Sequence, residues 1–445
     1  MTSAHVSIII MAVAIVVYVS NKLPIPITAM LSASAMVVFG IIPANQAFAS
    51  LGQDNVLILF GFLLIGSALF STGAAGIVGD LLIKIAGGKP KFSILLMFCV
   101  SGIMSFFLSN VAVVVMFAPL ILSVIIEAND KKIYEQKYMQ ALCVTTCCTG
   151  LVTLVGSPVN VAASGLVVAG GHPPFTFTQM AGLALILTGV ALVYAFTIGD
   201  KLSDLFFGKN RYQSELVKNF IAERENVKKK ALEEKSDPVA LKKANKKRIT
   251  ITVIMILTVA GIVTNDFHGI SMGTISVLGG IATVLFGCIP YKEMYARVDW
   301  GILLMITGTV GCATGLGASG GGRLIANFFL GLLGDAATPM SIFVGLTVLA
   351  AILTQFLSNS GTIGVLIPIG LAMAEIMGFN YLTIAIGITM STSMSFMTPM
   401  GTPTQAAALN WGSYKFSDYF KYSGPINVIL VIVIIILTPI FYPLV

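Results

Sequence analysis

The sequence predicts an all-α polytopic membrane protein made of two repeats, and three observations support this prediction. The first is composition: of 445 residues, 56% are hydrophobic and only 10% are charged, and the mean hydropathy is +0.94. The second is that the apolar residues gather into long segments. The third is that short motifs of the first half recur in the second half. Soluble globular domains do not have such a composition, whereas proteins that cross a membrane many times do.

The apolar segments follow the same order in both halves: three spans, one long interrupted segment and two more spans. In the first half they lie near 5–20, 25–42, 54–72, 92–126, 134–170 and 180–198. In the second half they lie near 249–264, 270–289, 299–317, 340–377, 381–411 and 424–443. A segment as long as 92–126 is too long for one crossing and short for two. We therefore expect this segment and its counterpart 340–377 to form re-entrant hairpins.

Three motif pairs indicate an internal duplication, because they occur in one order at offsets between 245 and 249 residues. The pairs are Phe39 to Pro43 with Phe286 to Pro290, Ser109-Asn110 with Ser358-Asn359, and Gly156-Ser157-Pro158 with Gly401-Thr402-Pro403. We place the first repeat at 1–199, a linker at 200–248 and the second repeat at 249–445.

The distribution of charge predicts the topology. The stretch 200–248 holds 14 of the 26 lysines and arginines, against 8 acidic residues. Excess positive charge marks the cytoplasmic side of a membrane protein, so we interpret this stretch as a solvated cytoplasmic loop and not as a nucleic-acid site. With five crossings per half, Arg323 is the one basic residue that falls outside, and both termini lie outside. Since five is odd, the two repeats would be inverted relative to each other.

The two Ser-Asn motifs would lie at the tips of the hairpins, near the middle of the membrane. At that depth, irregular backbone persists only where it is buried in protein or lines a wet cavity. Each tip brings free carbonyl groups, which suit a small cation, and free N–H groups, which suit an anion. The four-residue spacings of Ser105 with Ser109 and of Thr354 with Ser358 predict two hydroxyls on one helix face at each tip. We expect these oxygens to form a cage for a monovalent cation such as Na⁺.

The second motif pair predicts an unwound elbow in the fourth span of each repeat. Gly156-Ser157-Pro158 and Gly401-Thr402-Pro403 interrupt long apolar runs, and proline breaks a helix because it lacks the N–H donor and restricts the preceding residue. No Lys or Arg lies near a tip or an elbow, so an anionic substrate would be held by helix N-termini, amides, hydroxyls and co-bound cations. Cation binding would then be a prerequisite for anion binding, which couples the two events.

These motifs, together with the opening stretch Leu23-Pro24-Ile25-Pro26-Ile27-Thr28-Ala29, resemble the divalent anion/sodium symporter family of the ion transporter superfamily, from about residue 20 onward. The resemblance implies a homodimer in the cell (inner) membrane, with a transport domain that moves as an elevator. It implies transport of dicarboxylates, citrate or sulfate, coupled in most members to Na⁺. By position, the cation sites would use Ser105, Ser109, Asn110 and Gly156, and Thr354, Ser358, Asn359 and Gly401. The substrate would contact Asn110, Ser157, Asn359, Ser360, Thr402 and Pro403.

The sequence departs from the family pattern at several of these positions. The family triplet Ser-Asn-Thr reads Ser-Asn-Val at the first tip and Ser-Asn-Ser at the second. The elbows read Pro-Val-Asn and Pro-Thr-Gln, where the family has Pro-Pro-Asn. The loss of a hydroxyl at Val111 changes one substrate contact, so the identity of the anion stays open. Coupling to Na⁺, coupling to H⁺ and exchange also stay open.

Two alternatives to a carboxylate transporter are considered. One is a transporter of an inorganic oxyanion such as sulfate or arsenite, or a cation/proton antiporter, which usually needs a carboxylate in the middle of a span. No pair of aspartates lies there. The other is an intramembrane enzyme, which needs a Ser-His or Asp-Asp pair or His-Glu metal ligands at membrane depth. The sequence has none of these, so we do not expect an enzyme.

Overall fold

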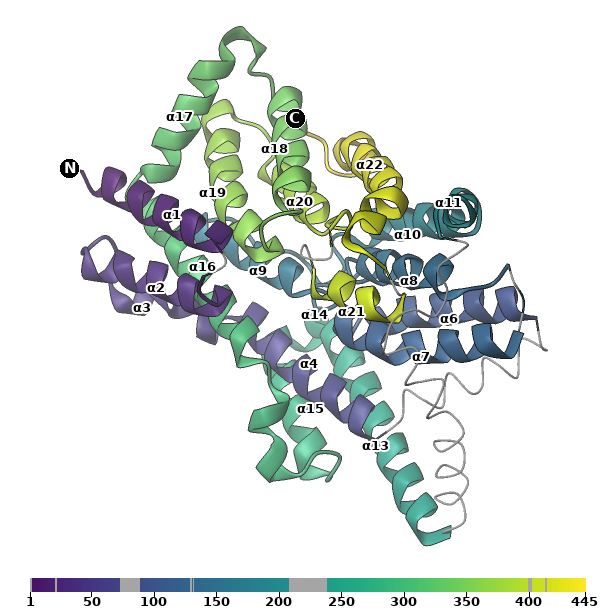
Figure 1. The fold of residues 1–445 in the computed structure, drawn as a ribbon. Coiled ribbons are helices and arrows are strands. Elements are labelled where there is room, and N and C mark those ends of the chain that lie inside the picture. The colour runs from purple at the N-terminus through teal and green to yellow at the C-terminus, as the bar shows by residue number, and fades with distance from the viewer. Residues whose placement is uncertain are drawn as a thin grey trace.

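The computed structural model describes residues 2–20, 22–72, 89–128, 130, 132–207, 238–398, 402–412 and 414–445. All regular elements among these residues are helices, as Figure 1 shows. This agrees with the helical class that the sequence predicts, because long apolar segments satisfy their backbone hydrogen bonds within themselves.

The first half contains ten α-helices within the described residues. They are α1 (Ser3–Ser20), α2 (Ile25–Val38), α3 (Ala44–Ala47), α4 (Asp54–Ser71), α6 (Pro90–Ser105), α7 (Asn110–Ala128), α8 (Glu135–Thr149), α9 (Pro158–Ala169), α10 (Ala181–Phe196) and α11 (Ile198–Phe206). Proline occupies one of the first two positions of α2, α6 and α9, where its missing N–H has no intrahelical partner to lose.

The second half repeats this order with helices of similar length. They are α13 (Pro238–Val263), α14 (Asn265–His268), α15 (Met272–Leu285), α16 (Trp300–Ala318), α17 (Gly321–Leu333), α18 (Pro339–Leu353), α19 (Asn359–Met377), α20 (Tyr381–Thr392), α21 (Pro403–Trp411) and α22 (Phe416–Phe441). The long segments that the sequence predicts to be interrupted are therefore helix pairs: α6 with α7, α8 with α9, α18 with α19, and α20 with α21.

Three of the described helices are long and apolar enough to cross a membrane alone: Trp300–Ala318, Asn359–Met377 and Ser417–Phe441. The pair α10 and α11 also qualifies when taken together, although it bends by 43°. Nine other helices contain an apolar stretch of 10–17 residues. A core about 30 Å thick needs about 20 helical residues, so these shorter helices fit a fold in which many spans are tilted or broken midway.

Two long helix pairs pack through glycine in equivalent ways. In the first, α15 runs along α4, and a Cβ atom added to Gly61 would lie 2.1 Å from the carbonyl oxygen of Ser276. In the second, α16 runs along α2, and a Cβ atom on Gly308 would lie 2.5 Å from the carbonyl oxygen of Ala29. Gly61 and Gly308 are 247 residues apart, as are Ala29 and Ser276. Helices in lipid associate by such close backbone approach, because apolar side chains gain little from leaving lipid.

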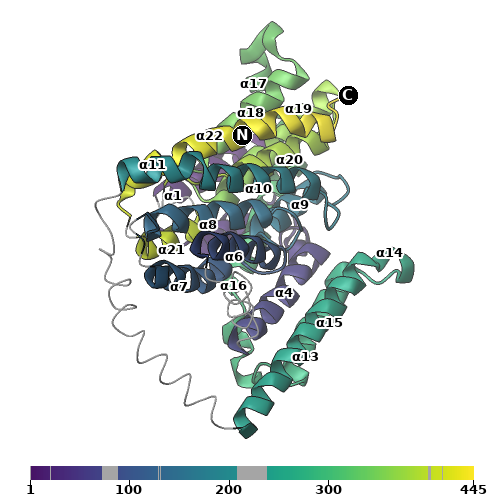
Figure 2. The same cartoon turned by 90° about the vertical axis from the view of Figure 1, so that its right-hand side faces the viewer.

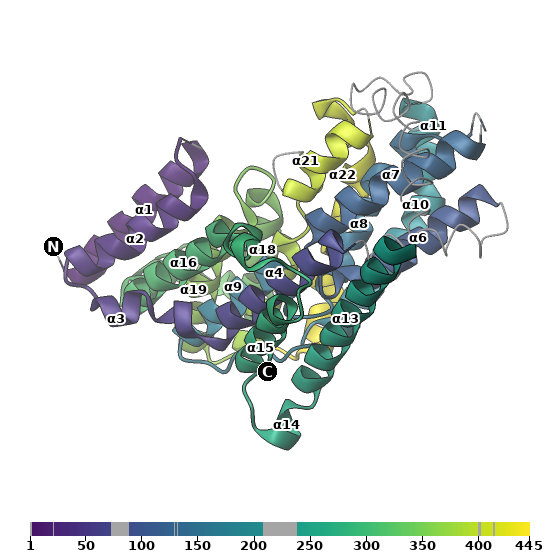
Figure 3. The same ribbon diagram turned by 90° about the horizontal axis from the view of Figure 1, so that it is seen from below.

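The remaining helices form a second group. Layers of α6, α8 and α10 lie side by side in Figure 2, and α18, α20 and α22 pack next to them. Viewed from below, α1, α2 and α3 lie on the opposite side of the molecule from α6, α7, α10 and α11 (Figure 3). Between the two groups, α9 contacts both α16 and α19. The breaks of the four helix pairs meet in this central region.

Ion pairs mark two ends of the molecule. Near the start of α8, the fully buried ammonium group of Lys137 lies 2.9 Å from carboxylate oxygens of both Asp200 and Asp204 on α11. The second ion pair joins Arg323 on α17 to Glu375 on α19 at 2.5 Å. Figure 1 shows α17 at the top of the molecule and α13 at the bottom. Arg323 is the residue that the charge distribution predicts to stand alone among basic groups on its side.

Candidate substrate and cation site

The first hairpin turns between Ser105, the last residue of α6, and Asn110, the first residue of α7. Ser105 is completely buried. Its hydroxyl donates to the carbonyl oxygen of Thr146 on α8 at 2.9 Å and is also hydrogen-bonded to the carboxamide of Asn110, whose nitrogen donates to it in the orientation that satisfies the amide. The hydroxyl of Thr153, in the elbow after α8, donates to the carbonyl oxygen of Phe106. The turn is therefore bonded to the broken span beside it.

The second hairpin repeats these bonds between α18 and α19. The hydroxyl of Thr354 lies 2.7 Å from both the carbonyl oxygen of Thr392 and Oδ1 of Asn359, and its one proton is shared between these two acceptors. The hydroxyl of Thr398 donates to the carbonyl oxygen of Gln355 at 2.7 Å. Every member of this set lies 245 to 249 residues after its counterpart in the first hairpin. The duplication seen in the sequence therefore extends to individual hydrogen bonds.

One expectation about these tips is wrong. The four-residue spacing predicted that Ser105 and Ser109, and likewise Thr354 and Ser358, share a helix face. In the structure the helix ends between the two members of each pair. Ser358 is instead the N-cap of α19, and its hydroxyl accepts a hydrogen bond from the N–H of Gly361 at 3.1 Å. The spacing rule holds only along a continuous helix, and the partner of Thr354 is Asn359.

The first elbow, residues 150–157, joins α8 to α9. Ser157 is the N-cap of α9, and its hydroxyl accepts from the N–H of Val159 at 3.3 Å. The side-chain amide of Asn160 donates to the carbonyl oxygens of Gly150 at 3.1 Å and Thr153 at 2.9 Å. Since Asn160 is fully buried, these two bonds hold the irregular backbone of the elbow in place.

The second elbow joins α20 to α21. Thr402 is the N-cap of α21 and accepts from the N–H of Gln405 at 3.3 Å, and Pro403 is the first residue of the helix. The predicted cation ligand Gly401 lies outside the described residues. The N-cap role of Thr402 matches that of Ser157, 245 residues earlier.

Both tips and both elbows meet at one cavity of about 560 Å³. Seven of the predicted site residues line it: Ser109, Asn110, Ser157, Ser358, Asn359, Ser360 and Thr402. Ser105 and Thr354, both fully buried, lie behind Asn110 and Asn359 and are hydrogen-bonded to them. Gly156 packs against the carbonyl oxygen of Ser105. The structure therefore brings together residues that are almost 300 positions apart in the chain.

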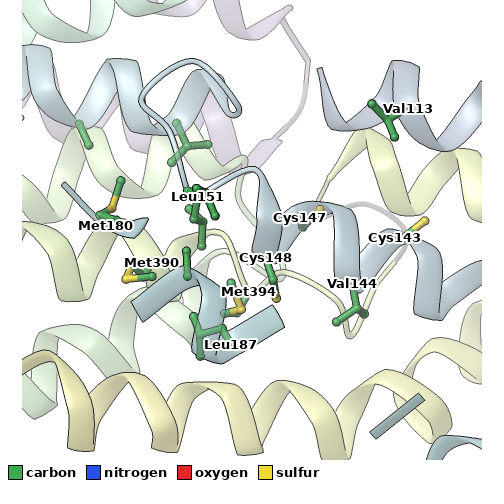
Figure 4. Packing of buried hydrophobic residues seen from close by; sticks show 14 of the residues in the cluster. Val113, Cys143, Val144, Cys147, Cys148, Leu151, Met180, Leu187, Met390 and Met394 are labelled. Atoms are coloured by element: carbon green, nitrogen blue, oxygen red, sulfur yellow. The ribbon is translucent and has the colours of Figure 1, made fainter. Parts of the chain in front are cut away.

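Sequence reasoning missed several residues of the cavity wall. Cys147 on α8 and Ser393 after α20 both line it, and they are 246 residues apart. This offset is the signal that could have identified them. Cys147 belongs to the same buried cluster as Cys143, Cys148 and Met394 (Figure 4). Cys147 therefore packs in the core and also faces the cavity.

The electrostatic character of the cavity comes from the backbone. None of the described residues that line it is charged. Four helices begin at its wall: α7 at Asn110, α9 after Ser157, α19 after Ser358 and α21 after Thr402. A helix N-terminus carries free N–H groups and a partial positive charge, which favours anions. The cavity can therefore attract an anion without an arginine or a lysine.

Oxygen atoms gather on the other side of the first tip. The carboxamide of Asn110 donates to the carbonyl oxygens of Thr146 and Gly156, each at 3.2 Å, when its nitrogen faces them. When its oxygen faces them, it joins the hydroxyl of Ser105 and these carbonyls in a cluster of oxygens. Neutral oxygens of this kind are the ligands that hard cations prefer. Among the described residues, no three His, Cys, Asp or Glu side chains are close enough to hold a metal ion.

A family model for citrate transporters matches residues 15–342 and 335–444. The chain belongs to the citrate transporter family. It is thus an integral membrane transporter of the citrate and dicarboxylate type and not an enzyme. The resemblance stated above from the tip and elbow motifs is confirmed at this level, since the sodium-dependent dicarboxylate transporters are among the relatives of the chain.

The relatives share low identity over nearly the full length. A transporter of Haemophilus influenzae is 22% identical over 97% of this chain and 90% of its own length. The sodium-dependent dicarboxylate transporter SdcS of Staphylococcus saprophyticus is 21% identical over 96% of this chain and 84% of its own. Among solved structures, the Alcanivorax borkumensis YdaH transporter has a TM-score of 0.59 at 13% identity, covering 91% of this chain and 87% of its own. Neisseria gonorrhoeae MtrF has a TM-score of 0.57 at 15% identity, covering 99% and 95%.

This transporter has a second cavity that adjoins the central one. It has a volume of about 660 Å³ and shares Ser109, Val111 and Ile302 with the central cavity. Asp299, the exposed N-cap of α16, also lines it. The central cavity is therefore continuous with a second cavity between α7 and the start of α16, which reaches the exposed Asp299.

Proposed function

We propose that this protein is a secondary active transporter that carries small di- or tricarboxylate anions across the cytoplasmic membrane together with Na⁺. The observation that carries the proposal is the meeting of four helix N-termini at one uncharged cavity that lies beside oxygen-rich helix C-termini. The positive ends of the helix dipoles suit carboxylates. The carbonyl and hydroxyl oxygens behind Asn110 and Asn359 suit a small cation.

Coupling follows from this arrangement. Asn110 and Asn359 each have one end at the cavity and one end at a hydroxyl, Ser105 or Thr354, of the proposed cation site. A cation bound behind each asparagine would orient the amide and add positive charge beside the anion. Each ligand would then raise the affinity for the other by the same factor. The name of the sodium-dependent relative supports Na⁺ as the coupling ion.

We further propose two inverted repeats, 1–199 and 249–445, joined by a cytoplasmic linker, with both termini outside. The equivalent glycine contacts of α4 with α15 and of α2 with α16 support this arrangement, since α4 packs on α15 as its counterpart α16 packs on α2, the counterpart of α15. In an elevator motion, the group with α6–α11 and α18–α22 would move past the group with α1–α4 and α13–α17. A homodimer would anchor the second group, as the family resemblance implies.

Uptake into proteoliposomes tests the proposal. Radiolabelled citrate and succinate are offered with an inward Na⁺ gradient, with K⁺ in its place, and with sulfate or arsenite as competitors. We expect Na⁺-driven uptake in the wild type and in Asn327→Ala, an exposed position on α17, but not in Asn110→Ala or Asn359→Ala. Uptake that is unaffected by both cavity variants would refute the site. Competition by oxyanions alone would move the substrate class to inorganic anions.

A further inference from the structure

We propose that Gln355 is a positioning residue that fixes the wall of the second cation site and makes the second hairpin more rigid than the first. Gln355 lies in the turn between α18 and α19 and is 5% exposed. Its counterpart in the first hairpin is Phe106, 249 residues earlier. The two residues share a position in the turn, but Phe106 is half-buried and apolar, whereas Gln355 is buried and has a side chain that can form hydrogen bonds.

The carboxamide of Gln355 is bonded at both ends. Its nitrogen donates to the carbonyl oxygens of Ala351 on α18 and Met394, each at 2.9 Å. Its oxygen accepts from the N–H of Met397 at 3.0 Å. A buried amide that satisfies two main-chain groups of an irregular segment fixes that segment, because breaking either bond leaves a buried polar group without a partner. Gln355 therefore ties the hairpin turn to residues 394–397.

The segment that Gln355 holds contains two serines that lie beside the cavity or bond to Asn359. Ser393, one residue before Met394, lines the central cavity. The hydroxyl of Ser395 donates to Oδ1 of Asn359 at 3.1 Å. Asn359 is the residue through which the proposed cation and anion interact. A shift of this segment would thus move oxygen atoms on both sides of Asn359.

The first half holds its elbow in another way. The N–H of Val152, the counterpart of Met397, donates to the nearby carbonyl oxygen of Thr149 at 3.0 Å. Asn160 on α9 supplies the side-chain bonds to the elbow. Both elbows are bonded to their hairpin turn by a threonine hydroxyl, but the second has two further bonds to the turn, both from the side chain of Gln355.

The counterpart of Asn160 supports this difference. It is Gln405, whose carboxamide is fully buried and has no partner at either end among the described residues. Gln405 does not perform the role of Asn160, and Gln355 takes it over from across the site. As a consequence, more side-chain bonds join the second tip to its elbow than join the first tip to its elbow, and the first tip is the less constrained of the two.

The experiment compares Gln355→Leu with wild type and with Phe356→Leu, a control in the same turn whose side chain is 75% exposed. Two quantities are measured: the Na⁺ concentration for half-maximal citrate uptake, and hydrogen exchange of the peptide containing residues 394–398. We expect Gln355→Leu to raise the Na⁺ half-saturation about tenfold. We expect the citrate KM at saturating Na⁺ to change less than about twofold, and exchange at Met397 to accelerate without Na⁺. Phe356→Leu should match wild type.

A second variant separates the hydrogen bond to Asn359 from the hydrogen bonds of Gln355. Ser395→Ala removes the hydroxyl bonded to Asn359 and leaves the Gln355 bonds intact. It should raise the Na⁺ half-saturation without accelerating exchange at Met397. It also keeps the inference testable where Gln355→Leu fails to fold. An unchanged Na⁺ half-saturation in both variants would overturn the inference.

The inference rests on the proposed function, and the two can fail separately. Wild-type protein that takes up no carboxylate and gains no protection from Na⁺ would refute the proposed function. Hydrogen exchange would still test whether Gln355 holds residues 394–397 in that case. Equal exchange at Met397 in wild type and Gln355→Leu would refute this role of Gln355. Faster exchange at Met397 in Gln355→Leu, with no effect of Na⁺ on exchange, would confirm that Gln355 holds this segment and would refute its connection to a cation site.

Discussion

Gly156 packs directly against the backbone of Ser105, with no room for a side chain between the elbow and the first tip. A Cβ atom added to Gly156 would lie 2.6 Å from the carbonyl oxygen of Ser105 and 2.4 Å from that of Gly150. The elbow and the hairpin tip are thus in main-chain contact beside the oxygen cluster of Asn110. Their separation decides whether these oxygens can surround a cation.

A Gly156→Ala substitution should therefore weaken cation binding. The methyl group would push the elbow from the tip and separate the carbonyl oxygens of Ser105 and Gly150. We expect the Na⁺ half-saturation of citrate uptake to rise about fivefold or more, since overpacking of this kind costs about 1–3 kcal/mol. Gly189→Ala is the matched control, because a Cβ atom at Gly189 would contact nothing within 4 Å. Equal Na⁺ dependence of the two variants would contradict this prediction.

The contact of Gly308 with Ala29 should govern stability rather than transport. Gly308→Val would force α16 away from α2, where the added Cβ atom alone would come within 2.5 Å of main-chain atoms. We expect a loss of about 3 kcal/mol or more, since the backbone of two packed helices must move. The measurement is the melting temperature in detergent, which should fall by several degrees. Gly345→Val, on α18 with open space around it, should leave the melting temperature near that of wild type.

Asn160 and Gln405 should differ in their contribution to stability despite their equivalent positions. Asn160→Leu leaves the carbonyl oxygens of Gly150 and Thr153 without their donor, and each unsatisfied buried group costs about 1–3 kcal/mol. Gln405→Leu removes a buried carboxamide that has no partner in the described part of the chain, so it should be neutral or stabilising. Denaturation of both variants in one detergent tests the pair. A larger loss for Gln405→Leu would show that its carboxamide is in fact bonded.

The buried ammonium group of Lys137 should stabilise the end of α8. Lys137→Met leaves Asp200 and Asp204 facing an apolar side chain, and we expect a loss of about 1–3 kcal/mol, reduced because both carboxylates reach solvent. Lys91→Met is the control: Lys91 is 57% exposed and lies 3.8 Å from Asp200, so its loss should be under about 0.5 kcal/mol. Thermal unfolding at neutral pH compares the two. Similar losses would refute the special role of the buried amine.

The pH dependence of this contribution has a definite sign. Burial raises the pKa of Asp204, but the hydrogen bond and the charge of Lys137 outweigh it and lower the pKa below its usual value. A lowered native pKa stabilises the fold above the unfolded-state value of about 3.9. The stabilisation is lost as the pH falls through the lowered pKa. Acid unfolding should therefore begin at a higher pH in Asp204→Asn than in wild type.

Much of the candidate site could be predicted from the sequence, because the duplication marks it. A Ser-Asn pair in an apolar segment is unfavourable unless its polar groups are satisfied, and the same device at an offset of 249 residues indicates a functional reason. The helix breaks at Asn110 and Asn359 and the N-caps Ser157 and Thr402 follow from local chemistry. Those features depend on a few neighbouring residues.

Bonds across the break could not be predicted. The spacing of Thr354 and Ser358 suggested one helix face, but the chain turns between them and Thr354 bonds to Thr392 instead. Cys147 and Ser393 gave no local signal of facing a cavity. Nothing in the sequence indicated that the side chain of Gln355 forms three hydrogen bonds. Each of these facts depends on which distant segment packs against the residue.

The sequence by itself determined the membrane class, the helical composition, and the recurrence of the tip and elbow motifs with their residue types. The physical reason is that lipid excludes unpaired backbone groups, so the apolar segments and their breaks are already visible in one dimension. Only the tertiary structure decided that Asn110 and Asn359 share a cavity, that Gly156 contacts Ser105, and that Gln355 rather than Gln405 holds the second elbow. Close packing decides such contacts, and it is a property of surfaces that the chain brings together only when it folds.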